Sequence, residues 1–123
     1  RGPFAPQLED YLKEHARDYD LVITHNAVFR TASQAIKAAN DAGVPSVIVP
    51  HAHFEDDYYH FPDVLDAIRN ATRALITPKV ACDFMKGIGA ENVAFLSPGI
   101  DCLETFSDED CAAFRKVHGR GTP

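Results

Sequence analysis

Short apolar runs alternate with segments of helical spacing along this chain. The runs are LVIT at 21–24, VIV at 47–49, ALIT at 74–77 and VAFL at 93–96. Each run is continuously apolar instead of alternating in polarity, which is typical of strands that are buried on both faces. The sequence therefore predicts four short strands of a parallel sheet.

Apolar positions between these runs recur every three or four residues, which predicts amphipathic helices. Pro6 and Pro62 stand where a helix can begin, and Gly43 stands where one can end. The segment TASQ at 31–34 fits a capping box at the start of the second helix. A last helix is expected from Ser107, and its apolar positions are predicted to be buried. These positions are Cys111, Phe114 and Val117.

The alternation of strands and helices predicts the fold class. We expect an α/β fold, a three-layer Rossmann-like parallel sheet of about four strands with helices on both faces. A length of 123 residues fits one domain. We expect residues 119–123 to be a linker or the start of an absent segment.

Charge, apolar run length and cysteine spacing indicate which partners and which cellular compartment to expect. The net charge is −6 and the cationic residues form no cluster, so nucleic acid is not expected as a partner. No apolar run approaches the roughly 18 residues of a membrane span, so there is no strong membrane signal. The three cysteines lack paired spacing, which favours reduced thiols and a cytoplasmic location.

Polar residues follow each predicted strand, at the edge where parallel sheets bind ligands. Since the carboxyl ends of parallel strands share one edge, we expect these side chains to face one crevice. In chain order the residues are His25, Asn26, His51, His53, Thr77, Lys79, Ser97 and Gly99.

Histidines are the most informative residues at this edge. His51 directly follows a strand, so it is rigid enough to hold a hydroxyl or to act in proton transfer near neutral pH. His51 and His53 could share a metal ion with His25, but two or three histidines without a carboxylate or cysteine pattern are a weak signal, and we predict no metal site. We interpret His60 and the neighbouring tyrosines as loop surface.

The order of several short motifs resembles a known family. The motifs are HN at 25–26, GVP at 43–45, PHAH at 50–53 and SPGID at 97–101. Together they resemble the N-terminal, acceptor-side domain of retaining glycosyltransferases of the large group 1 family (family 4), which have the GT-B fold. The resemblance covers nearly the whole chain from residue 20 onward.

The resemblance implies a sugar transfer from a nucleotide-sugar donor to an unknown acceptor, with no further cofactor. His51 matches the catalytic position beside the transferred sugar, and Gly99 and Asp101 match an interdomain hinge. The matching substrate-binding positions are His25, Asn26, His53, Phe54, Thr77 and Lys79. The resemblance also implies that residues 1–118 are a partial N-terminal domain and that residues 119–123 are a linker toward an absent second domain. Such a fragment lacks most of the donor site and is expected to be inactive alone. We expect its truncated sheet to expose an edge and an apolar face that could form a homodimer.

Two other functions compete with this interpretation. One is a complete, flavodoxin-like or receiver-like module that binds a small ligand. A receiver would need acidic residues at the strand ends, where this chain has His25 and His51. The other is a histidine-based metal hydrolase, which stoichiometric zinc at His51 and His53 would favour.

Overall fold

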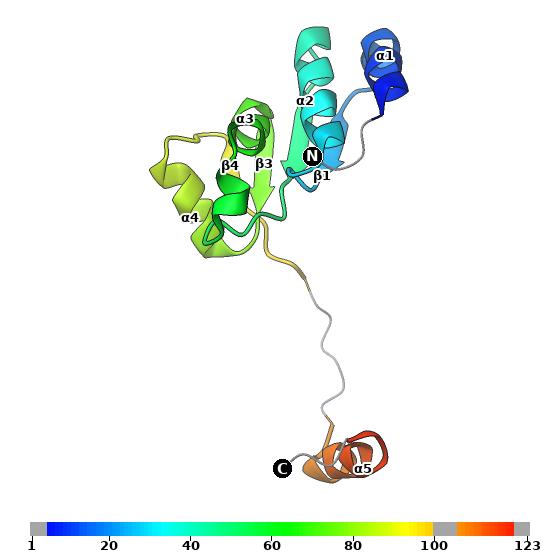
Figure 1. The fold of residues 1–123 in the computed structure, drawn as a ribbon, viewed down its shortest axis with the longest axis vertical. Helices are drawn as coiled ribbons and strands as arrows, with labels where there is room; N and C mark the ends of the chain where they lie inside the picture. Colours follow the sequence, from blue (N-terminus) through cyan, green and yellow to red (C-terminus); the bar gives the residue numbers. More distant parts are fainter. Residues whose placement is uncertain (1–4, 100–105, 120–123) are drawn as a thin grey trace.

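The computed structural model of the chain describes residues 5–99 and 106–119. Its four strands are β1 (Val22–His25), β2 (Ser46–Val49), β3 (Arg73–Ile76) and β4 (Val93–Phe95). They form one sheet in the order β1-β2-β3-β4, and every neighbouring pair is parallel. The helices are α1 (Pro6–His15), η1 (Ala16–Asp18), α2 (Arg30–Ala42), η2 (Asp57–His60), α3 (Pro62–Asn70), α4 (Lys79–Gly87) and α5 (Asp108–His118). The predicted α/β fold, a Rossmann-like parallel sheet of four strands flanked by helices, is confirmed (Figure 1).

The helix ends follow the local signals in most places. Pro6 and Pro62 occupy the first turns of α1 and α3, where a missing N–H leaves no hydrogen bond unmade. Gly43 ends α2 with φ = 72°, a left-handed conformation that glycine adopts without steric penalty. The predicted capping box at Thr31 is wrong, because α2 begins at Arg30, two residues before the start that a Thr31 cap implies, and Phe29 caps it without a side-chain hydrogen bond.

One face of the sheet, the covered face, holds the core. Each crossover helix joins two neighbouring strands, and right-handed crossovers of this kind place successive helices on the same side. The inward side chains of α2, α3 and α4 meet the strands in one cluster that includes Ile36, Ile68 and Met85. On the strands, Ile48, Ala74 and Ile76 are fully buried in that cluster.

The opposite face, the open face, is less buried. Strand alternation and the register place Ile23, Val47, Val49, Leu75 and Ala94 there. Ile23 is 59% exposed, and the other four are only half-buried. The prediction of strands buried on both faces is therefore wrong for the open face. Within the described residues, the helices that join the strands all pack on the covered face.

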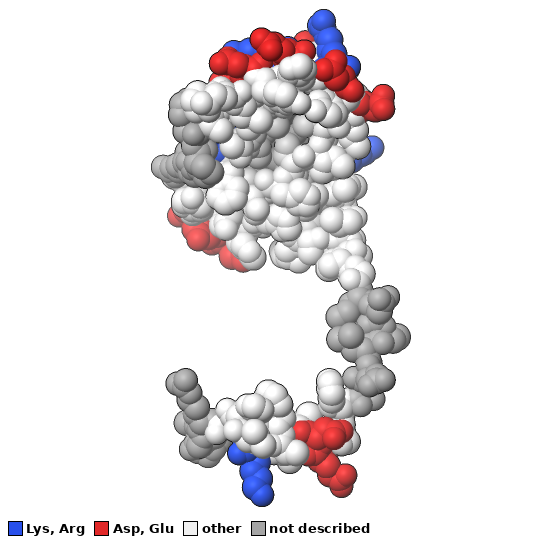
Figure 2. Space-filling model, turned by 90° about the vertical axis from the view of Figure 1, so that its right-hand side faces the viewer, with Lys and Arg blue, Asp and Glu red and all other residues white. Residues whose placement is uncertain are grey.

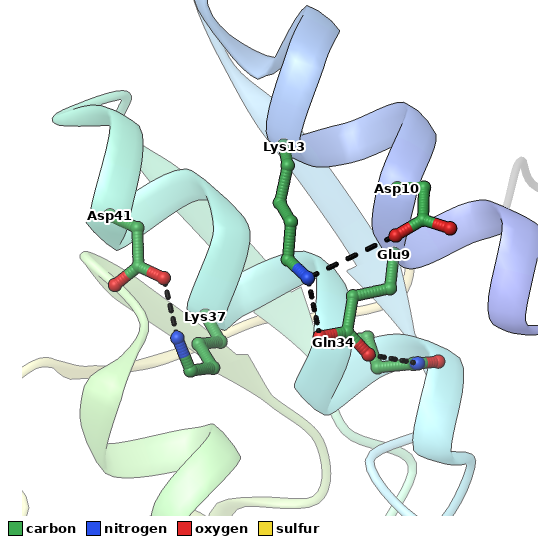
Figure 3. A network of polar contacts seen from close by, with 6 residues as sticks. All are labelled: Glu9, Asp10, Lys13, Gln34, Lys37 and Asp41. Carbon is green, nitrogen blue, oxygen red and sulfur yellow. Dashed lines mark hydrogen bonds and ion pairs between the residues drawn. The ribbon is translucent and has the colours of Figure 1, made fainter.

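Helix α1 extends the covered face beyond the edge strand β1. Leu12 packs with Ala35 and Ala38 of α2 in a second, smaller apolar cluster. A polar contact joins the same two helices, because the Gln34 amide donates to Glu9 at 3.3 Å (Figure 3). Lys13 lies 3.1 Å from Glu9, and its hydrogen bond is the main cause of the lowered pKa of that carboxyl group.

Helix α5 forms as expected, but its apolar side chains are not buried. Ser107 caps it in a reciprocal capping box with Asp110. The predicted burial of its apolar positions is wrong, since Phe114 is 66% exposed, Val117 is 74% exposed and Cys111 is half-buried. Among the helices of residues 5–99 and 106–119, none is long and apolar enough to cross a membrane.

Candidate functional site at the carboxyl edge of the sheet

Two backbone hydrogen bonds hold the loops after β1 and β2 side by side. The Asn26 amide donates to the Val49 carbonyl at 3.0 Å, and the Ala27 amide donates to the Pro50 carbonyl at 3.0 Å. These bonds continue the parallel ladder past the strand ends. They bring His25, the last residue of β1, next to His51, which directly follows β2 and Pro50.

The two imidazoles form an exposed pair. His25 Nδ1 lies 3.3 Å from His51 Nε2, and the rings stack with centroids 5.6 Å apart and an interplanar angle of 23°. A neutral imidazole has one N–H and one acceptor nitrogen. Whichever ring donates within the pair, one of the two outward nitrogens, His25 Nε2 and His51 Nδ1, carries a proton and the other does not. The pair therefore presents one donor and one acceptor to solvent.

The backbone at this edge adopts conformations that side chains usually avoid. Asn26 has φ = 59° and His51 has φ = 47°. L-residues in the left-handed region carry a steric cost of about 1–2 kcal/mol, although asparagine and histidine adopt it more often than most side chains. Positive φ values of this kind concentrate at sites where geometry serves a ligand. The strain at His51 thus marks this edge independently of the ring contact.

The two candidates after β3 are engaged with other parts of the protein. The Thr77 hydroxyl donates to the Leu96 carbonyl, which ties the ends of β3 and β4 together. Lys79 Nζ donates to Asp83 at 2.7 Å, one helical turn later. This hydrogen bond is the main cause of the raised pKa of Lys79. Both side chains are exposed, but neither shares a contact with the histidine pair.

The loop after His51 makes more hydrogen bonds and ring contacts than the sequence pattern indicated. Asp56 accepts a hydrogen bond from the Tyr58 amide at 2.8 Å and thereby caps η2. His60 was interpreted as loop surface, but it is half-buried, hydrogen-bonds the Phe54 carbonyl at 2.7 Å and stacks on Phe84. Phe54 itself is 6% exposed and also stacks on Phe84, so it offers little surface to a ligand.

The other predicted residues lie at different places on this edge. His53 is exposed, 3.5 Å from Glu55, with its ring against the edge of Tyr59. Asn26 is half-buried, and its carbonyl accepts from the Phe29 amide. Gly99 is exposed. Asp101 lies outside the described residues.

A crevice of about 190 Å³ lies between the loop after β1 and the start of α3. Three partly exposed aromatic side chains line it: Phe29, Tyr58 and Phe61. None of these three residues was predicted from the sequence as part of a site. The density of aromatic residues between 54 and 61 is the signal that points to Tyr58 and Phe61. The crevice begins beside the histidine pair along the chain, but neither histidine lines it.

Among the described ranges 5–99 and 106–119, no group of three or more His, Cys, Asp and Glu side chains lies close enough to hold a metal ion. Comparison with protein-family models, with curated proteins and with solved structures found no match for this chain.

Proposed function

We propose that the carboxyl edge of the sheet binds a hydroxyl group of a polyhydroxylated ligand, and that this edge is the acceptor side of a sugar-transferring enzyme. The observation that carries the proposal is the 3.3 Å contact between His25 Nδ1 and His51 Nε2. A polyhydroxylated ligand carries several hydroxyl groups that donate and accept hydrogen bonds, and the two outward nitrogens, one donor and one acceptor, can each bind a different one of them.

The same pair suits proton transfer from the hydroxyl. If the accepting outward nitrogen takes the hydroxyl proton, the positive charge is shared with the second ring through the bond between them. A positioned imidazole of this kind is a common general base. In the proposed reaction, His51 would hold the acceptor hydroxyl, and His25 would fix the tautomer and orientation of the His51 ring.

Imidazole NMR signals test the binding step with this chain. We expect methyl glucoside, galactoside or mannoside to shift the signals of His25 and His51 in a saturable manner. His15 lies on α1 and serves as an internal reference. The matched ligand control is 2-methoxytetrahydropyran, a ring without hydroxyl groups, which should produce no shift.

Two results would overturn the proposal. One is an equal response to the ring without hydroxyl groups. The other is no response to any pyranoside together with stoichiometric binding of zinc chloride by the two histidines, which would favour the metal-hydrolase alternative.

The strain at His51 supplies a variant that separates function from folding. His51→Gly removes the imidazole and also relieves the positive φ, so we expect pyranoside binding to be lost while the free energy of unfolding rises by about 1 kcal/mol. Asn26→Gly is the matched control, because asparagine tolerates this conformation and the rings remain in place. Retained pyranoside binding in His51→Gly would remove His51 from the site.

A further inference from the structure

We infer that the open face of the sheet is a docking surface for the chain's own helix α5. The inference is independent of the proposed function, because it rests on two apolar surfaces and not on the histidine pair. Strands β1 to β4 present one unpartnered apolar surface, and α5 presents another.

The open face is apolar and carries little charge. Of the residues that the register places on it, Ile23, Val47, Val49, Leu75 and Ala94 are apolar. Arg73 is the charged member, at the amino end of β3, and His25 lies at the carboxyl end of β1. Figure 2 shows one side of the molecule, on which a broad stretch carries almost no Lys, Arg, Asp or Glu between charged ends.

Helix α5 has a matching surface. Cys111, Phe114 and Val117 recur at three-residue spacing, so they form one stripe along the helix. None of the residues of α5 is buried. Its acidic first turn and its basic last turn lie at the two ends of the stripe, which leaves the middle of the stripe free of charge.

The dimensions of the two surfaces agree. Eleven residues of α5 give a length of about 16 Å at ~1.5 Å per residue. Four strands spaced ~4.8 Å apart make a sheet about 14 Å across. One helix of this length therefore covers the open face from edge to edge.

The segment between β4 and α5 is long enough for α5 to reach the open face. It is also short enough to favour contact within one chain. Residues 96–107 separate β4 from α5 in sequence, and twelve residues can span at most about 40 Å. Since β4 is itself part of the sheet, the open face lies within this reach. A tether of this length gives an effective concentration of roughly millimolar, which favours α5 of the same chain over a second copy in dilute solution.

Docking would bury apolar side chains on both the open face and α5. The continuous apolar runs of the strands and the apolar stripe of α5 are both patterns of buried residues. While the two elements are apart, most apolar residues of the open face are only half-buried, and Phe114 and Val117 of the stripe are exposed. Docking of α5 buries the open face and the apolar stripe against each other. It also places a helix on the second face of the sheet.

Methyl NMR tests the contact in the full chain. Phe114→Asp should shift the methyl signals of Val47, Val49 and Leu75, because it removes a ring and places a carboxylate on the stripe. Ala112→Asp is the matched control: it adds the same carboxylate on the opposite side of α5 and should leave these signals unchanged. Identical open-face signals in wild type and Phe114→Asp would overturn the inference.

Disulfide formation gives a second readout that does not depend on helix stability. In a Cys102→Ser background, Leu75→Cys should form an intramolecular disulfide with Cys111 at least about tenfold faster than Lys37→Cys, whose position lies on α2 and is exposed. Cys82 is buried and does not compete. Equal rates at the two positions, or disulfide-linked dimers that increase with concentration, would show that α5 does not dock on its own sheet.

Discussion

The two faces of this sheet are built from similar side chains but have different surroundings. Ile48 on the covered face is fully buried beneath the helices, whereas Ile23 on the open face is 59% exposed. The difference arises from topology. Because consecutive strands are neighbours, the helices that connect them gather on one side. The apolar character of a strand residue thus indicates that it requires a cover, and chain connectivity decides which face receives one.

The largest expected effect is the contrast between two truncations of the same side chain. Ile48→Ala leaves a cavity among fully buried neighbours and should lower the free energy of unfolding by about 2–5 kcal/mol. Ile23→Ala removes the same atoms from an edge strand, at a position that only α5 could cover, and should lower it by a smaller amount, about 1 kcal/mol. Urea denaturation measures both. Equal losses would mean that the open face is as well packed as the covered face.

A smaller contrast concerns polar groups on the same two faces. Ser46 is fully buried, and its hydroxyl accepts from the Thr72 amide at 3.1 Å, while its own amide donates to the Thr72 hydroxyl at 2.9 Å. Ser46→Ala should cost about 1–3 kcal/mol, because the Thr72 amide loses its partner. Arg73→Ala, at the residue that follows Thr72 and lies on the open face, should change the free energy of unfolding by less than about 0.5 kcal/mol. A neutral Ser46→Ala would indicate that water replaces the lost partner.

The parts of the fold that the sequence predicted correctly are those decided by neighbouring residues in the chain. The four apolar runs became strands, and Pro62 and Gly43 mark helix ends because their own backbone preferences decide the outcome. The cap predicted at Thr31 is wrong because of a non-local contact. Helix α2 starts two residues earlier, after a loop whose amides donate hydrogen bonds to the end of β2 and to Pro50. Burial of Phe114 failed for a related reason, since periodicity identifies the apolar stripe but not its partner.

The candidate site shows the same limit. The sequence pattern predicted that the residues after the strands lie at one edge of the sheet, with His25 and His51 among them. Their ring contact depends on the register of β1 against β2 and on the positive φ of His51, neither of which a sequence pattern specifies. Lys79 and Thr77 were equally reasonable from the pattern, but their hydrogen bonds to Asp83 and Leu96 became apparent only in three dimensions.

The smallest expected effect concerns the helix that we infer to cover the open face. Asp110 accepts hydrogen bonds from the Ser107 hydroxyl at 2.6 Å and from the Ser107 amide at 3.0 Å, and these bonds lower its pKa below the ordinary value of 3.8. A carboxyl group with a lowered pKa stabilises the folded form above its unfolded pKa, and this contribution is lost as the pH falls through the folded value.

Acidification from about pH 7 to about pH 2.5 should therefore reduce the helical content of residues 108–118, measured by Cα chemical shifts. Asp110→Ala should show the reduction already at neutral pH and respond less to acid, whereas Glu109→Ala, which keeps the capping box, should behave like wild type. If α5 covers the open face, the Val47 and Leu75 methyl signals should change over the same pH range as the helix. Methyl signals that stay constant while α5 loses its helical shifts would separate the helix from the sheet and leave the open face without its cover.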